Sequence, residues 1–278
     1  MYLPIIGSFL EAAGMILEKR LLKKKKLNYK NYTVYEFFAI FIVMLPFAYF
    51  FLDIKPQALS LFNISLLLFV ILVSVGANLL IFYSLKRKTL TEFEPLWLMQ
   101  PFFTIVLAFI LYKSERNFSL ILLALIASLS LILAHVKKHH LVYDKYIIAA
   151  LLGGFLFAVE LTISKLLLPF YNPFAFYFIR CFFIFIICYF IFRPSGRDVN
   201  KNSVLIIILI GIIWPIYRII IYYGYENLGI IFTTVLFLLS PILILLFAII
   251  FLKEKITHKQ ILSTIVILLC IILSIYVG

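Results

Sequence analysis

The stretch IIFTTVLFLLSPILILLFAIIFLKEK, residues 230–255, decides the fold. The hydrocarbon core of a bilayer is about 30 Å thick, and a helix needs about 20 mostly apolar residues to cross it. This run is long enough, with Pro241 inside it and charged residues at its end. The stretch therefore predicts a membrane-spanning helix that contains a proline.

An earlier stretch, TEFEPLWLMQPFFTIVLAFILYKSER at 91–116, resembles it. Tyr83 precedes Pro101 by 18 positions, and Tyr223 precedes Pro241 by 18. A glutamate follows each proline, at 14 and 13 positions. Chance matches among Leu, Ile and Phe mean little in so apolar a chain. The ordered recurrence of Tyr, Pro and Glu indicates an internal repeat.

The repeat extends to the beginning of each half of the chain. Gly-Ser-Phe-Leu at 7–10 aligns with Gly-Gly-Phe-Leu at 153–156. We therefore predict two repeats of five helices each, residues 1–138 and 139–278. Because five is odd, the second repeat enters the membrane from the opposite side. Such inverted repeats place the substrate site near the midplane where they meet.

Composition places the chain among all-α integral membrane proteins. The 278 residues are 65% hydrophobic and 13% charged, with mean hydropathy +1.15, whereas soluble domains are about 45–50% apolar and about 25% charged. The ten predicted transmembrane helices cover residues 3–19, 32–52, 63–85, 92–112, 117–136, 146–168, 173–192, 203–225, 230–252 and 258–277. The connections leave no room for a soluble domain.

The formal charge of +13 does not indicate nucleic-acid binding, because the basic residues lie between apolar runs. Loops after odd-numbered spans hold 19 Lys and Arg residues, and the other loops hold 4. The positive-inside rule then predicts that both termini lie outside the cytoplasm. We expect the Lys23–Lys26 cluster to contact anionic lipid.

No motif of enzymes or metal sites is present. Cys181, Cys188 and Cys270 lie inside apolar runs without a CxxC pair, and the four histidines lie at span ends or in loops. HExxH, Walker A and GxSxG motifs are absent. We therefore expect no enzymatic activity, no cofactor and no metal.

Two five-helix repeats, with a proline in the fourth span of each, a glutamate closing that span and a lysine closing the first, resemble the drug/metabolite transporter superfamily, particularly its EamA-like family. The residues that carry the resemblance are Lys19, Lys165, Arg180, Pro101, Glu115, Pro241 and Glu254. The resemblance covers the whole chain. It implies export of amino acids, metabolites or drugs, or exchange of phosphorylated metabolites, usually without ATP. It also implies cytoplasmic termini, in contrast to the loop charges.

Four ionisable residues lie inside predicted spans, where each costs about 2.5–3.5 kcal/mol and indicates function. They are Glu11, Glu160, Arg180 and Arg218. Counted from the span ends, all four lie about 10–12 Å below one face. As a binding site, the arginines would hold a carboxylate or phosphate and a glutamate would carry a proton. A static salt-bridge set is an equally weighted alternative. Arg218 aligns with Asn78 in the repeat, so packing does not require the charge.

Prolines and aromatic residues complete the candidate site. Pro101 and Pro241 each free a backbone carbonyl one turn earlier, which predicts a hinge or a polar notch in the cavity. Aromatic side chains that could wall a pocket are Tyr83, Trp97, Trp214, Tyr217, Tyr222 and Tyr223. Glu115 and Glu254 lie at span ends beside Lys and Arg neighbours, so we expect interfacial pairing there rather than proton coupling.

These observations predict a secondary carrier in the cell membrane, an exporter or exchanger of a small polar or amphipathic metabolite such as an amino acid or anionic metabolite. A proton gradient or substrate exchange would drive alternating movement of the repeats. Two alternatives stay open: multidrug efflux of hydrophobic cations, which the two buried arginines disfavour, and a non-transporting membrane scaffold. The expected partners are the substrate, protons and anionic lipids, with a monomer or homodimer as the assembly.

Overall fold

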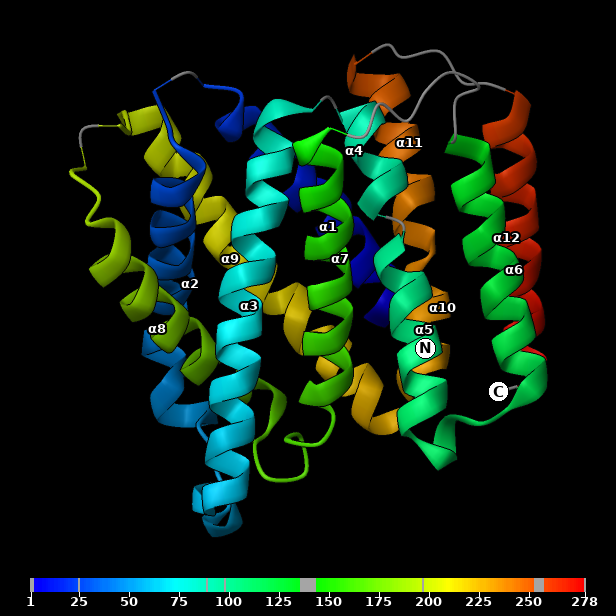
Figure 1. Ribbon diagram of the computed structural model, residues 1–278, viewed down its shortest axis with the longest axis horizontal. Helices are drawn as coiled ribbons and strands as arrows, with labels where there is room; N and C mark the ends of the chain where they lie inside the picture. Colours follow the sequence, from blue (N-terminus) through cyan, green and yellow to red (C-terminus); the bar gives the residue numbers. More distant parts are fainter. Residues whose placement is uncertain are drawn as a thin grey trace.

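The computed structural model describes residues 3–24, 26–88, 90–97, 99–135, 144–196, 198–252 and 258–277. These residues form helices joined by short connections (Figure 1). The helices are α1 (Leu3–Leu22), α2 (Tyr29–Phe51), η1 (Pro56–Leu59), α3 (Leu61–Arg87), α4 (Leu90–Trp97), α5 (Met99–Leu111), η2 (Lys113–Glu115), α6 (Phe118–His135), α7 (Lys145–Ser164), α8 (Pro173–Phe192), α9 (Lys201–Asn227), α10 (Ile230–Phe237), α11 (Leu239–Leu252) and α12 (His258–Val277).

Five of the described helices are long and apolar enough to cross a membrane: α2, α3, α7, α8 and α9. Their hydropathy agrees with the predicted multi-pass architecture. Each predicted span overlaps one helix or one pair of consecutive helices. Local polar side chains set several helix starts, because an N-cap oxygen accepts an otherwise unpaired backbone N–H. These caps are Asn28, Ser60, Asp144, Asn172 and Asn200.

A turn divides the span that contains Pro241 into two helices. Helix α10 ends at Phe237, Leu238 forms the turn, and α11 begins at Leu239. Phe237 precedes Pro241 by four residues. A proline ring clashes with the carbonyl four residues earlier and offers no N–H to it. Pro241 thus explains the position of this break, and Pro101 occupies the aligned position in the first half.

Helices of the first half pack mainly against helices of the second half (Figure 1). Helix α3 lies against α7, α1 against α9, α2 against α8, and α6 against α12. Small residues permit the closest approaches. A Cβ added at Gly211 in α9 would lie 3.0 Å from the backbone of Ala39 in α2. The interface between the halves is therefore the core of the molecule.

The connections alternate between two ends of the molecule. In Figure 1, the ends of α1, α3 and α8 and the beginnings of α2 and α9 lie at the top. The α2–α3, α7–α8 and α9–α10 connections lie at the bottom. Most Lys and Arg residues of the described connections belong to the top end, which we call the basic end.

Candidate functional site

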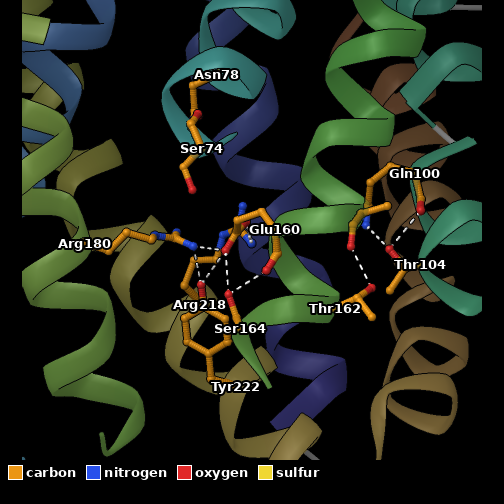
Figure 2. Close-up of polar contacts among 11 residues, drawn as sticks. Ser74, Asn78, Gln100, Thr104, Glu160, Thr162, Ser164, Arg180, Arg218 and Tyr222 are labelled. Carbon is orange, nitrogen blue, oxygen red and sulfur yellow. Dashed lines mark hydrogen bonds and ion pairs between the residues drawn. The ribbon is translucent and has the colours of Figure 1, made fainter. Parts of the chain in front are cut away.

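A buried charge cluster occupies the middle of the helix bundle. Glu160 of α7 is 0% exposed and forms ion pairs with Arg180 of α8 and Arg218 of α9. The Arg218 Nη1 atom lies 3.4 Å from Glu160 Oε2, whereas Arg180 Nη1 contacts Oε1. Figure 2 shows the two arginines reaching Glu160 from different helices. The structure therefore brings three of the four predicted charged residues into direct contact.

Two hydroxyl groups also donate hydrogen bonds to the Glu160 carboxylate. Tyr222 donates to Glu160 Oε1 at 3.0 Å, and Ser164 donates to it at 3.2 Å (Figure 2). The Arg180 guanidinium also lies 4.9 Å from the centroid of the Tyr177 ring. Sequence reasoning grouped Tyr222 with possible pocket walls, but its hydroxyl belongs to the charge cluster. Buried ions need such hydrogen bonds to offset the loss of water.

A second acidic group was not predicted. Glu18 of α1 and Glu36 of α2 are 4% and 3% exposed, and their carboxyl groups adjoin each other and the Tyr32 hydroxyl. Trp214 Nε1 donates to Glu18 Oε1 at 2.7 Å. Among the described residues, Glu36 Oε2 has no hydrogen-bond partner and no cation pairs with either carboxylate. Two adjacent buried carboxylates repel each other, which favours a proton or a cation between them.

A sequence signal for this pair existed. Glu36 lies inside the predicted span 32–52, so the criterion that selected Glu11 and Glu160 selects it too. Glu18 follows Glu11 by seven residues, two helical turns, which places both on one face of α1. The pairing of Glu18 with Glu36 across α1 and α2 depends on helix packing and could not be read from spacing.

The Glu18–Glu36 pair and both arginines line one central cavity of about 50 Å³. Its walls come from both halves of the chain and include Glu18, Glu36, Asn78, Trp97, Gln100, Phe157, Arg180, Trp214, Tyr217 and Arg218. The structure places the predicted residues Asn78, Trp214 and Tyr217 in this lining. A cavity of this size admits only a few water molecules. A metabolite-sized ligand requires the surrounding helices to separate.

The fourth predicted charge, Glu11, lies in a neighbouring cavity of about 30 Å³. Trp97 Nε1 donates to its Oε1 atom at 3.3 Å. Pro101 and Pro241 both line this cavity, which we call the proline cavity. Trp97 and Tyr217 are among the residues that line both cavities. The prolines and Glu11 are therefore joined to the central cavity by shared walls.

Two predicted aromatic residues lie elsewhere. Tyr83 lines a separate cavity at the basic end and packs against Tyr29 and Tyr146, at 5.2 and 4.9 Å between ring centroids. Tyr223 is 51% exposed on the outside of α9 and does not reach the central cavity. Successive residues of a helix turn by about 100°. Because Tyr222 points inward to Glu160, its neighbour Tyr223 points away, and the prediction that it walls the cavity is corrected.

The fourth-span glutamate of the first half has a different partner from the one expected. Glu115 is buried, and it pairs with Lys165 at the end of α7 instead of Lys113 or Arg116. It also accepts the backbone N–H groups of Ile230 and Ile231, at 2.8 and 3.1 Å. It thus caps α10 and joins both halves. Its counterpart Glu254 lies outside the described residues.

Acidic groups outnumber basic groups around the two joined cavities. The carboxyl groups are Glu11, Glu18, Glu36 and Glu160, against the guanidiniums of Arg180 and Arg218. Both arginines already contact Glu160. Protons or a cationic group can balance the remaining negative charge. Among the described residues, no group of three or more His, Cys, Asp or Glu side chains is placed to hold a metal ion.

Comparisons with known proteins agree with this architecture. The model of the EamA-like transporter family matches residues 1–135 and 144–276. A solved chain, described only as a crystal structure of a protein, superposes with a TM-score of 0.67 and 14% identity, covering 96% of each chain. At that identity the likeness shows the fold alone. No curated protein sequence matches the chain.

Proposed function

Because the chain belongs to the EamA-like transporter family, we propose that it is a secondary active carrier that exports or exchanges a small polar or amphipathic metabolite by alternating access. The observation that carries this proposal is the central cavity, where buried charges from both halves of the chain converge. A cavity between the halves changes its access when they rock against each other.

The packing of the helices supports two inverted repeats related by a pseudo-two-fold axis. If α1, α2 and α3 correspond to α7, α8 and α9, exchanging the halves converts the α1–α9 contact into the α7–α3 contact. It likewise converts α5–α7 into α11–α1. The family model also matches two consecutive segments of the chain. The aligned prolines, Pro101 and Pro241, would then serve as equivalent hinges.

The charges suggest roles within such a cycle. Arg180 and Arg218 can receive a substrate carboxylate or phosphate when Glu160 yields part of its contact, since guanidinium groups bind such anions in bidentate geometry. The Glu18–Glu36 pair can hold one proton, because the second carboxylate would be costly to ionise beside the first. Binding of a proton at that pair and of a substrate at the arginines would couple transport to a proton gradient.

A second candidate function is efflux of hydrophobic cations. The sequence disfavoured it because two arginines are buried, but both contact Glu160, while the Glu18–Glu36 pair adjoins the indole of Trp214. Carboxylates beside aromatic rings are suited to organic cations. The two functions therefore differ in which charged pair contacts the substrate.

The deciding experiment is ligand-induced thermal stabilisation of the detergent-purified protein. The panel contains amino acids, nucleotides, sugar phosphates and quaternary amines, tested on wild type, Arg218→Gln and Glu36→Gln. A bound ligand stabilises the folded state by RT ln(1 + [L]/Kd). Stabilisation by an anionic or zwitterionic ligand, lost in Arg218→Gln, supports the metabolite carrier. Stabilisation by a quaternary amine, lost in Glu36→Gln only, supports cation efflux.

Transport by the same variants tests the remaining alternative, a membrane scaffold. Proteoliposomes containing the stabilising ligand and an imposed pH gradient should accumulate or release that ligand with wild type, and the Glu36→Gln variant should lose the dependence on the gradient. If both variants changed thermal stability only and no panel ligand moved across the membrane, the carrier proposal would fail in favour of a scaffold.

A further inference from the structure

A third cavity, of about 520 Å³, opens at the basic end of the molecule and is far larger than the central cavity. Its lining residues belong to the α1–α2 connection, the start of α2 and the end of α3. We call it the basic cavity, and its walls include Lys26, Tyr29, Lys30, Tyr83, Lys86 and Arg87. The proposed transport cycle gives it no role.

The lining of this cavity carries four positive charges and, among its described residues, no acidic side chain. None of the described ion pairs includes Lys26, Lys30, Lys86 or Arg87. The Lys86 ammonium donates to the carbonyl of Leu27, which fixes it at the wall. Four like charges around one space repel one another, and an anion inside would relieve that repulsion.

The position of the cavity identifies the source of the anion. The cavity is bounded by the ends of α2 and α3, two helices long and apolar enough to cross a membrane. The rings of Tyr29 and Tyr83 pack together at its wall. Tyrosines and basic residues at helix ends typically lie at the level of lipid headgroups. A bilayer presents phosphate groups at this level.

We propose that the basic cavity binds the phosphate-bearing headgroup of an anionic lipid. The ammonium and guanidinium groups hold the phosphate, and the two tyrosines flank the glycerol region. This site is distinct from general attraction of the basic loops to a charged membrane, because it is a concave site formed by particular side chains. It is also separate from the central cavity, so occupancy does not require a transported substrate.

The test is a native mass spectrometry titration of the full chain in detergent with phosphatidylglycerol, phosphatidylcholine or glycerol 3-phosphate. Lys26→Gln/Arg87→Gln removes two charges from the cavity, and both side chains are exposed, so the fold should persist. Lys23→Gln/Lys201→Gln is the matched control, since it removes two exposed charges near the same end outside the lining.

We expect phosphatidylglycerol to bind wild type in preference to phosphatidylcholine, and to bind the cavity variant roughly thirty-fold more weakly. The control variant should lose less than about three-fold, because its lysines do not line the cavity. An equal loss of phosphatidylglycerol affinity in both variants would contradict the proposed lipid site. Equal binding of phosphatidylglycerol and phosphatidylcholine to wild type would contradict it too. If glycerol 3-phosphate bound as tightly as the lipid, the phosphate would be confirmed as the recognised group and the lipid source would be wrong.

Discussion

Glu160 joins two buried arginines at the centre of this molecule. It is fully buried and is the shared partner of Arg180 and Arg218. Removing one member of a buried ion pair costs more than the pair contributes, because the remaining charge stays in a poorly solvating environment. A change at Glu160 should therefore lower the free energy of unfolding, because it leaves the two buried arginines without a carboxylate partner.

Glu160→Gln should destabilise the protein by about 3–5 kcal/mol, since it leaves two guanidiniums without a carboxylate. The double variant Glu160→Gln/Arg180→Gln should be less destabilised than the sum of the single variants, because it removes one charge of each sign. Unfolding in detergent micelles measures both effects. Glu226→Gln, at an exposed position of the same helix as Arg218, is the control and should stay within about 0.5 kcal/mol of wild type.

A Glu160→Gln variant as stable as wild type would contradict this account. It would mean that the arginines find other partners, and the cluster would lose its structural role. Additive effects of the two substitutions would equally exclude direct coupling between the residues.

At the scale of elements, the break before Pro241 leaves α10 as an eight-residue helix whose first turn depends on another segment. Its first N–H groups have no partners within the helix. Glu115, 115 positions before Ile230, supplies them, and Lys165 neutralises the carboxylate. The helix therefore forms in this place only when the two halves are docked.

Glu115→Ala should cost about 1–3 kcal/mol, because it leaves two buried N–H groups and one lysine without their partner. Glu115→Gln should cost less, since an amide oxygen still accepts one N–H. Hydrogen exchange of the first turn of α10 measures the local effect, and it should accelerate most in the alanine variant. Lys113→Gln, an exposed change in the same 3-10 turn, should leave the exchange unchanged. Equal exchange in all three variants would refute the cap.

Helix contact makes a further prediction at this scale. Gly211→Ala should destabilise the protein by about 1–3 kcal/mol, because the new Cβ would lie 3.0 Å from backbone atoms of Ala39 that cannot move aside easily. Gly76→Ala is the matched change on α3, where the nearest atom would be 3.5 Å away. It should be neutral or stabilising by up to about 1 kcal/mol. Thermal unfolding compares them, and the opposite order would show that α2 and α9 are loosely packed.

At the scale of the whole molecule, charge is distributed unevenly between the two ends. The sequence places 19 Lys and Arg in one set of loops and 4 in the other. The described connections of the first set gather at the basic end (Figure 1). If this end faces the cytoplasm, anionic lipid of the cytoplasmic leaflet lies beside the basic cavity.

We expect both termini to lie outside the cytoplasm. A C-terminal alkaline phosphatase fusion expressed in a bacterial host should be active, and a C-terminal fluorescent-protein fusion should be dark, because only the first reporter folds outside. Neutralising Lys23, Lys24 and Lys26 should weaken the preference, since positive loop residues determine orientation. A fluorescent fusion and an inactive phosphatase would show that the chain keeps the cytoplasmic termini that the family resemblance implies.

The sequence by itself determined the features that depend on local chemistry. Apolar runs longer than a bilayer is thick required membrane helices, polar caps set several helix starts, and Pro241 explains the break after Phe237. The family followed from the same repeat, as the match over residues 1–135 and 144–276 confirms. Isolated charges in apolar spans identified Glu160, Arg180 and Arg218, because burial of a charge is costly wherever it occurs.

Only the tertiary structure decided which of these groups meet. It paired Glu18 with Glu36, joined Glu115 to Lys165 and α10, and turned Tyr223 to the outside. Each outcome depends on the rotation of one helix about its axis relative to a neighbour far away in sequence. In a chain that is apolar on nearly every helix face, hydrophobic periodicity does not specify that rotation. Close packing at small residues and the pairing of buried polar groups specify it instead.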